Sequence, residues 1–197
     1  YLSFADEGIS NDELIGKGDP DLKGKHRLRK AAANAFDAMS QAALSDGFSI
    51  KVVSSYRSYD AQNRIWERKY QQFTSEGLSP TAAIEKIVEY STIPGTSRHH
   101  WGTDLDIVPE NTLQLEDELL EEHFNPGGPF HSFKLWLDKR ANSFGFYEVY
   151  TPDPNRKGFK YEPWHFSYKP LSKKYLKAYQ KIDIAQFSAV IFTSRNA

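Results

Sequence analysis

The 197-residue sequence contains no cysteine and a single methionine. The lack of cysteine excludes disulfides, thiolate metal ligands and a cysteine nucleophile. Histidine and carboxylate side chains are therefore the strong metal ligands that the chain can offer, and their arrangement is the feature to examine.

Long apolar runs and an excess of one charge are also missing. No stretch approaches the roughly 18 apolar residues of a membrane span, so we expect no stable membrane insertion. Charged residues make up 26% of the chain and nearly cancel, with a formal net charge of -1. Such a balance creates no field that attracts nucleic acid or an anionic membrane, whereas a neutral or zwitterionic substrate is compatible with it.

The length allows one sizeable hydrophobic core and is short for two ordinary domains. Residues 1–26 are rich in glycine, aspartate and lysine and show little periodicity, which predicts an irregular, loosely packed N-terminal arm. We expect a single domain over residues 27–197.

Apolar spacing and turn residues predict an α+β fold in which helices pack on a small antiparallel sheet. The polar stretch 109–129, rich in glycine and proline, is typical of an insertion or lid. Asp60 is the expected cap of the second helix. The predicted helices span residues 27–46, 60–72, 80–88, 133–144 and 171–186, and the predicted strands span 49–54, 103–108, 146–150 and 159–168.

Two histidines and two carboxylates lie within ten positions, namely His99, His100, Asp104 and Asp106. On a straight strand His99 and Asp106 would face opposite sides, because side chains alternate. Gly102 can supply a bend that turns both toward one point.

A second cluster, Glu162 and His165, is interrupted by Pro163, which lets both side chains face one site. Two imidazoles and one carboxylate with an open fourth position suit a catalytic zinc ion. Glu162 can then take a proton from water and deliver it to a leaving amine. The pattern is typical of amide hydrolysis.

The spacing Ser97-x-His99-x-x-Gly102-x-x-x-Asp106, followed by Glu162-x-x-His165, resembles the zinc D-alanyl-D-alanine carboxypeptidases of the VanY type. That group also includes lysostaphin-type endopeptidases and the hedgehog signalling domain. Upstream, Ser55-Tyr56-Arg57-Ser58-x-x-x-Gln62 is similar to the family's substrate-binding segment. The resemblance covers about residues 49–168.

The resemblance implies zinc ligation by His99, Asp106 and His165, and general base and acid duty for Glu162. Arg57 would bind the terminal carboxylate of the substrate, with Gln62 and Ser97 helping to hold the peptide. A planar guanidinium makes paired, charge-assisted hydrogen bonds to a carboxylate, so Arg57 would enforce exopeptidase action. We expect no metal ligation by His26, His100, His123 and His131.

Two positions depart from the family's pattern. Asp104 stands where relatives usually have a small residue, so it can orient a ligand or compete with Asp106 for the metal. We favour Asp106 by its spacing. Ser167 stands near a position where relatives commonly have arginine.

The expected activity is removal of C-terminal D-alanine from peptidoglycan stem peptides, across a D,D or an L,D bond. A D-Ala-D-Ala dipeptidase or a peptidoglycan endopeptidase is the alternative within the same chemistry, and a catalytically silent zinc or peptide-binding module is the alternative of another class. Retention of Glu162 argues against the silent module. We expect a monomer with no nucleic-acid partner. From the function we infer a bacterial periplasm, cell envelope or exterior location, although no signal peptide is visible at Tyr1.

Overall fold

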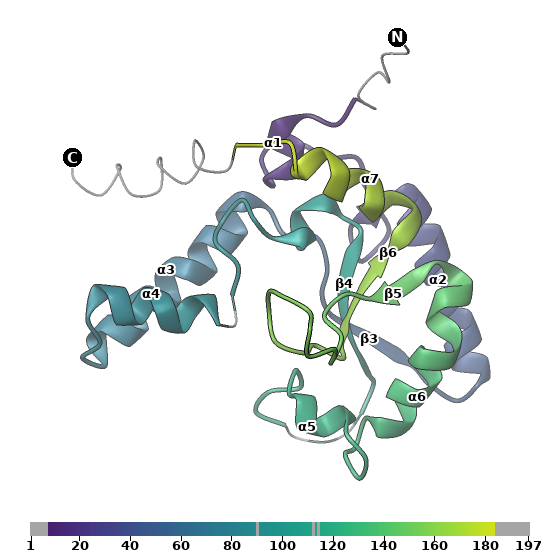
Figure 1. Ribbon diagram of the computed structural model, residues 1–197. Coiled ribbons are helices and arrows are strands. Elements are labelled where there is room, and N and C mark those ends of the chain that lie inside the picture. The colour runs from purple at the N-terminus through teal and green to yellow at the C-terminus, as the bar shows by residue number, and fades with distance from the viewer. Residues whose placement is uncertain (1–7, 90, 112, 114, 184–197) are drawn as a thin grey trace.

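The predicted α+β class is confirmed by the computed structural model, which describes residues 8–89, 91–111, 113 and 115–183 (Figure 1). Its main sheet is antiparallel throughout, with the strand order β3-β4-β6-β5. These strands are β3 (Ile50–Ser54), β4 (Asp104–Pro109), β5 (Phe146–Glu148) and β6 (His165–Tyr168), and a separate ribbon pairs β1 (Leu22–Lys23) with β2 (Leu28–Arg29).

The helices lie around this sheet, and none in the described part of the chain combines the length and apolarity needed to cross a membrane. The α-helices are α1 (Asn11–Leu14), α2 (Lys30–Ser45), α3 (Tyr59–Ser75), α4 (Pro80–Val88), α5 (Glu121–Phe124), α6 (His131–Arg140) and α7 (Lys169–Tyr179), and the 3-10 turns are η1 (Arg98–Trp101) and η2 (Ala141–Phe144).

Where β4 runs beside β6, strand alternation places apolar side chains on one face of the main sheet and polar side chains on the other. Leu105 and Ile107 of β4 and Phe166 of β6 are buried in the main core with apolar residues of α2 and α6. Asp104, Asp106 and His165 alternate with them and therefore point to the opposite face. The fold thus packs its core on one side of β4 and β6 and leaves the other side for chemistry.

Most predicted elements are observed, but several bounds differ for identifiable reasons. Helix α3 is capped by Ser58, whose hydroxyl accepts from the Ala61 N–H, so Asp60 lies in the first turn instead. Strand β6 begins only at His165, because Pro163 has no N–H for a ladder. The C-terminal helix begins at Lys169, and its predicted end at 186 lies outside the described residues.

The expectation of loose packing before residue 27 is wrong. Leu14 and Ile15 are each 1% exposed, and Leu14 packs against Trp101 and Tyr175. The Trp101 indole Nε1 also donates to the Leu14 carbonyl at 3.2 Å. Residues 10–15 therefore belong to the packed structure, while the division of the chain at residue 26 stays a prediction.

We expect Leu14→Ala to lower the free energy of unfolding by about 2–5 kcal/mol, as for other buried leucines. Leu44→Ala is the matched control, because Leu44 is 59% exposed and its truncation should cost less than about 0.5 kcal/mol. Urea denaturation of both variants provides the measurement. Equal, small losses would mean that the N-terminal segment adds nothing to stability.

Candidate metal centre and active site

The strand register brings the polar residues of the sheet together. Asp106 of β4 pairs with His165 of β6 on one side and with Ser54 of β3 on the other. Two positions earlier on β4, Asp104 pairs with Ser167. Since residues two apart on a strand share a face, these side chains form one polar group on the face opposite the core.

The sequence predicted that His99 would reach this group from a strand bent at Gly102. In the structure His99 lies on the 3-10 turn η1 instead. Ser97 caps the turn by accepting from the His99 N–H. Gly102 ends the turn with φ +68°, and a Cβ there would lie 2.7 Å from Leu22 Cδ2. Gly102 thus allows both the left-handed turn and the close approach of β1.

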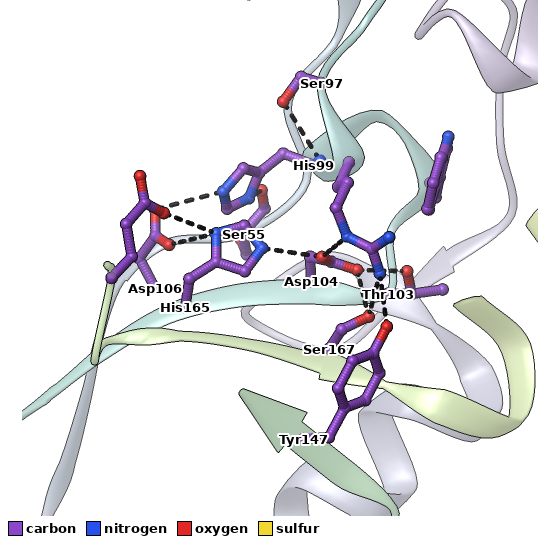
Figure 2. Close-up of polar contacts among 12 residues, drawn as sticks. Ser55, Ser97, His99, Thr103, Asp104, Asp106, Tyr147, His165 and Ser167 are labelled. Carbon is purple, nitrogen blue, oxygen red and sulfur yellow. Dashed lines mark hydrogen bonds and ion pairs between the residues drawn. The ribbon is translucent and has the colours of Figure 1, made fainter. Parts of the chain in front are cut away.

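The side chains of His99, Asp106 and His165 converge (Figure 2). His99 Nε2 lies 3.3 Å from Asp106 Oδ2, and His165 Nδ1 lies 3.2 Å from Asp106 Oδ1. One ligand atom from each residue falls within 4.8 Å of the others, and all three residues are buried. The spacing matches what a single metal ion would require of its ligands.

The hydrogen bonds behind each ring decide which nitrogen faces the site. His99 Nδ1 lies 2.8 Å from the Ser55 carbonyl, which can only accept, so Nδ1 carries the hydrogen and Nε2 keeps its lone pair. His165 Nε2 donates in the same way to Asp104 Oδ2 at 2.8 Å, which leaves the Nδ1 lone pair toward Asp106. Among the residues that the structure describes, none donates a hydrogen bond to Asp106 Oδ1. Two lone pairs and a carboxylate that face one another fit a bound cation.

The pKa shifts report the same anionic environment. Burial lowers the pKa of His165, but its hydrogen bond to Asp104 and the nearby carboxylates of Asp106 and Glu162 outweigh burial and raise that pKa well above its ordinary value. Burial raises the pKa of Asp106, yet His99 and His165 outweigh this effect and hold it below its usual range. The site therefore attracts positive charge, as a proton on His165 or as a metal.

Asp104 orients His165 and has no free position for a metal. Besides His165, its carboxylate accepts from Arg98 Nε at 2.8 Å, from Ser167 Oγ at 2.7 Å and from Thr103 Oγ1 at 2.7 Å. It is fully buried. The sequence left two roles open for Asp104, as a metal ligand or as a residue that orients a ligand, and the geometry favours the second. Near Ser167, where relatives commonly have arginine, the guanidinium of Arg98 donates to Ser167 Oγ.

Glu162 stands at the edge of the centre. Its Oε2 lies 3.4 Å from His165 Nδ1, and its side chain remains 23% exposed. The Glu162 N–H donates to the Tyr150 carbonyl at 3.0 Å, which anchors the segment that carries it. A carboxylate that is fixed by its backbone and open to solvent can accept a proton from water.

Arg57 lies beside the metal centre with its guanidinium held in place. Nη1 donates to Gln62 Oε1 and Nη2 donates to Ser54 Oγ, each at 2.7 Å. Burial lowers the pKa of Arg57, and the negative charges of Asp106 and Glu162 partly offset this lowering. Within the described residues no carboxylate forms an ion pair with Arg57, so its charge is available to an anionic ligand.

Gln62 acts behind Arg57. It is 1% exposed, its Oε1 accepts from Arg57, and its Nε2 donates to the Thr92 carbonyl at 2.8 Å. The expectation that Gln62 helps to hold the peptide stays a prediction, and its observed contacts are with Arg57 and the Thr92 backbone. Ser97, in contrast, lines the cavity.

A cavity of about 700 Å³ joins these residues. Residues 117 and 119–121 form part of its wall, so this part of the predicted 109–129 insertion lines one side of the site. Among the described residues, His26, His100, His123 and His131 lie outside the metal cluster. The lining residues include Arg57, Lys69, Ser97, His99, Asp106, Asp117, Leu120, Tyr150, Glu162, Trp164 and His165.

Comparison with known proteins places this geometry in a family. The VanY model, described as D-alanyl-D-alanine carboxypeptidase, matches residues 25–171. The chain belongs to the VanY family. The VanY match begins before the first main-sheet strand and ends within α7. It includes all of the predicted site residues, namely Arg57, Gln62, Ser97, His99, Asp106, Glu162 and His165.

Individual members of the VanY family and their structures extend the comparison. A D-alanyl-D-alanine carboxypeptidase of Enterococcus faecalis is 29% identical over 82% of this chain and 51% of its own length, so the chain spans about half of that relative. The LdcB LD-carboxypeptidase structure is 28% identical, with a TM-score of 0.58 over 82% of this chain and 71% of that chain. A Zn(II) complex of the D,D-pentapeptidase VanY shares the fold, with 24% identity and a TM-score of 0.61 over 83% and 85% of the two chains.

We expect Asp104→Asn to weaken zinc binding by about 10–100-fold, because the amide replaces the anion that orients His165. Competition with a chromophoric chelator gives the affinity. Asp37→Asn, on the exposed side of α2, is the matched control and should bind zinc normally. A folded Asp104→Asn protein with unchanged affinity would contradict the orienting role.

His100 predicts a pH dependence of stability. Burial lowers its pKa to about 4, and its ring bridges the Arg57 carbonyl and the Gly95 N–H. The unfolded histidine titrates near 6.5, so the unfolded chain binds more protons between these values. This contribution is complete above pH 6.5 and is lost as the pH falls toward 4, with a loss of about 2 kcal/mol at pH 5.

The measurement compares the wild type with His100→Gln by urea unfolding from pH 7.5 to pH 5. Other titrating groups affect both proteins equally. The difference between the two slopes of unfolding free energy against pH therefore reports the titration of His100. Parallel slopes would show that His100 does not titrate on unfolding.

Proposed function

We propose that this chain is a zinc-dependent carboxypeptidase that removes C-terminal D-alanine from peptidoglycan stem peptides. The observation that carries the proposal is the convergence of His99, Asp106 and His165 in one cavity, with Glu162 and Arg57 at its edge. The 29% identity to an enterococcal D-alanyl-D-alanine carboxypeptidase and the likeness to the LdcB LD-carboxypeptidase support the substrate class.

His99 Nε2, His165 Nδ1 and an Asp106 oxygen would hold the zinc ion. When bound, zinc supplies Lewis-acid chemistry that activates water and the amide carbonyl for hydrolysis. His165 depends on Asp104, and His99 on the Ser55 carbonyl, to present these nitrogens. The two hydrogen bonds would keep both rings in the binding orientation before the metal arrives.

Glu162 would act as base and then as acid. Its carboxylate accepts a proton from the attacking water and returns that proton to the leaving amine nitrogen, so the carboxylate is regenerated when the amide bond breaks. The position of Oε2 near His165 Nδ1 supports this role, because a base must lie within reach of the reacting water.

Arg57 would bind the terminal carboxylate of the peptide. A half-buried guanidinium without a carboxylate partner in the described chain suits an anionic ligand, and Ser54 and Gln62 fix its planar fork. Such a contact favours a free C-terminus over an internal bond and thus supports exopeptidase action.

This proposed function implies the peptidoglycan stem peptide as partner. It also implies a location in the bacterial periplasm, cell envelope or exterior. We propose a monomer, because every group assigned to the reaction lies on one chain. The bond could be D,D or L,D, and the assay below includes both substrates.

Incubation with muropeptides that end in D-Ala-D-Ala or in a single D-Ala tests the function, with and without a zinc chelator. We expect chelator-sensitive release of one alanine, detected by amine release and mass spectrometry. Release of a dipeptide would indicate the dipeptidase alternative, and internal cleavage the endopeptidase. No change in any peptide while the protein binds zinc would favour the silent module.

We expect Glu162→Gln to lower kcat by at least about a hundredfold while zinc binding is retained, because the amide cannot accept the proton. Glu122→Gln on α5 is the matched control, since Glu122 is exposed and does not line the cavity. Steady-state alanine release and zinc content are measured for both proteins. Near-normal turnover of Glu162→Gln would remove Glu162 from the mechanism.

A further inference from the structure

A second cation lines the catalytic cavity beyond Arg57. Lys69 of α3 is half-buried, and its ammonium Nζ donates to Ser91 Oγ at 2.6 Å. Burial lowers the pKa of Lys69, and the neighbouring charges of Arg68 and Arg57 lower it further. These groups make one wall of the cavity positive.

Lys69 has no anionic partner within the described chain. No carboxylate there forms an ion pair with its Nζ, and Asp117 acts on it only at longer range from another part of the cavity wall. Holding an unpaired ammonium partly away from water is unfavourable, so such a group in a substrate cavity suits an anionic ligand. The Ser91 hydroxyl orients the ammonium and uses one of its three hydrogens.

The position of Lys69 on α3 sets its distance along the helix from Gln62, the residue that holds Arg57. Lys69 follows Gln62 by seven residues, so both lie on one face of the helix about 10 Å apart. Gln62 holds Arg57 through its amide oxygen. An extended peptide advances about 3.3 Å per residue, so a chain anchored at Arg57 brings its residue two or three positions upstream near Lys69.

We infer that Lys69, oriented by Ser91, binds a carboxylate that the substrate carries two or three residues before its C-terminal residue. The preferred substrates are then acidic stem peptides, in which this carboxylate is free, over peptides in which it is amidated. Arg68 lies beside Lys69 at the exposed side of the cavity and adds to the positive potential. The inference rests on the proposed carboxypeptidase function and assigns its specificity.

Two synthetic pentapeptides that end in D-Ala-D-Ala test the assignment. They differ only at the γ-linked D-glutamate three residues before the C-terminus, which carries a free α-carboxylate in one and a carboxamide in the other. We expect the zinc-loaded wild type to cleave the acidic peptide with about a tenfold higher kcat/KM, the range of one charge-assisted hydrogen bond.

Variants on α3 then assign this preference to one side chain. Lys69→Met should lower kcat/KM for the acidic peptide to that of the amidated peptide and leave the amidated peptide within about twofold, because only the charged contact is lost. Lys69→Arg should keep the preference. Arg64→Met removes an exposed cation of the same helix outside the cavity lining and should behave as the wild type.

Equal wild-type rates on the two peptides would overturn the inference, as would a Lys69→Met variant that slows both peptides equally. In either case release of alanine leaves the proposed function standing. Release of no alanine from this pair and from the corresponding tetrapeptide pair that ends in a single D-Ala would overturn the proposed function and this inference with it.

Discussion

The hydrogen bond from His165 Nε2 to the buried carboxylate of Asp104 is the interaction on which the site depends. It fixes the tautomer of His165 and directs Nδ1 to the point where His99 and Asp106 meet. A buried carboxylate is costly unless it is paired, and here Arg98 supplies the pairing charge. Arg98 in turn lies over the Trp101 ring and donates to Ser167 and Tyr147, so the ring orientation is tied to the packing around η1.

Strand alternation explains how a small domain supports both a core and this polar group. Leu105 and Phe166 face the helices, while Asp104, Asp106, His165 and Ser167 occupy the alternate positions of the same two strands. A one-residue slip of β6 against β4 would turn Phe166 toward the polar face and His165 and Ser167 toward the core. The register that builds the core therefore also builds the site, and stability and metal binding share one constraint.

The sequence predicted the fold class, most helices and the strands, because the apolar periodicity of α2 and the turn residues before α4 are strong local signals. The two motifs also predicted that His99, Asp106, Glu162 and His165 would face one site. Other features depend on tertiary contacts that spacing does not encode. The buried packing of Leu14 needs Trp101 and Tyr175, and the 3-10 turn that carries His99 needs the contact of Gly102 with β1.

The roles of individual polar residues were harder to predict for the same reason. Asp104 has the same side-chain direction as Asp106, and only its contacts with Arg98 and Ser167 separate an orienting group from a ligand. Gln62 has the expected spacing from Arg57, but its burial decides that it acts on the arginine. Lys69 belongs to no motif, and its place in the cavity follows from the path of α3.

Anomalous diffraction at the zinc edge from zinc-soaked crystals would show whether one metal ion binds between specific atoms of three residues. We expect a single strong peak bonded to His99 Nε2, His165 Nδ1 and an oxygen of Asp106. A peak bonded to Asp104 or to His165 Nε2, or no peak at this position, would contradict this expectation.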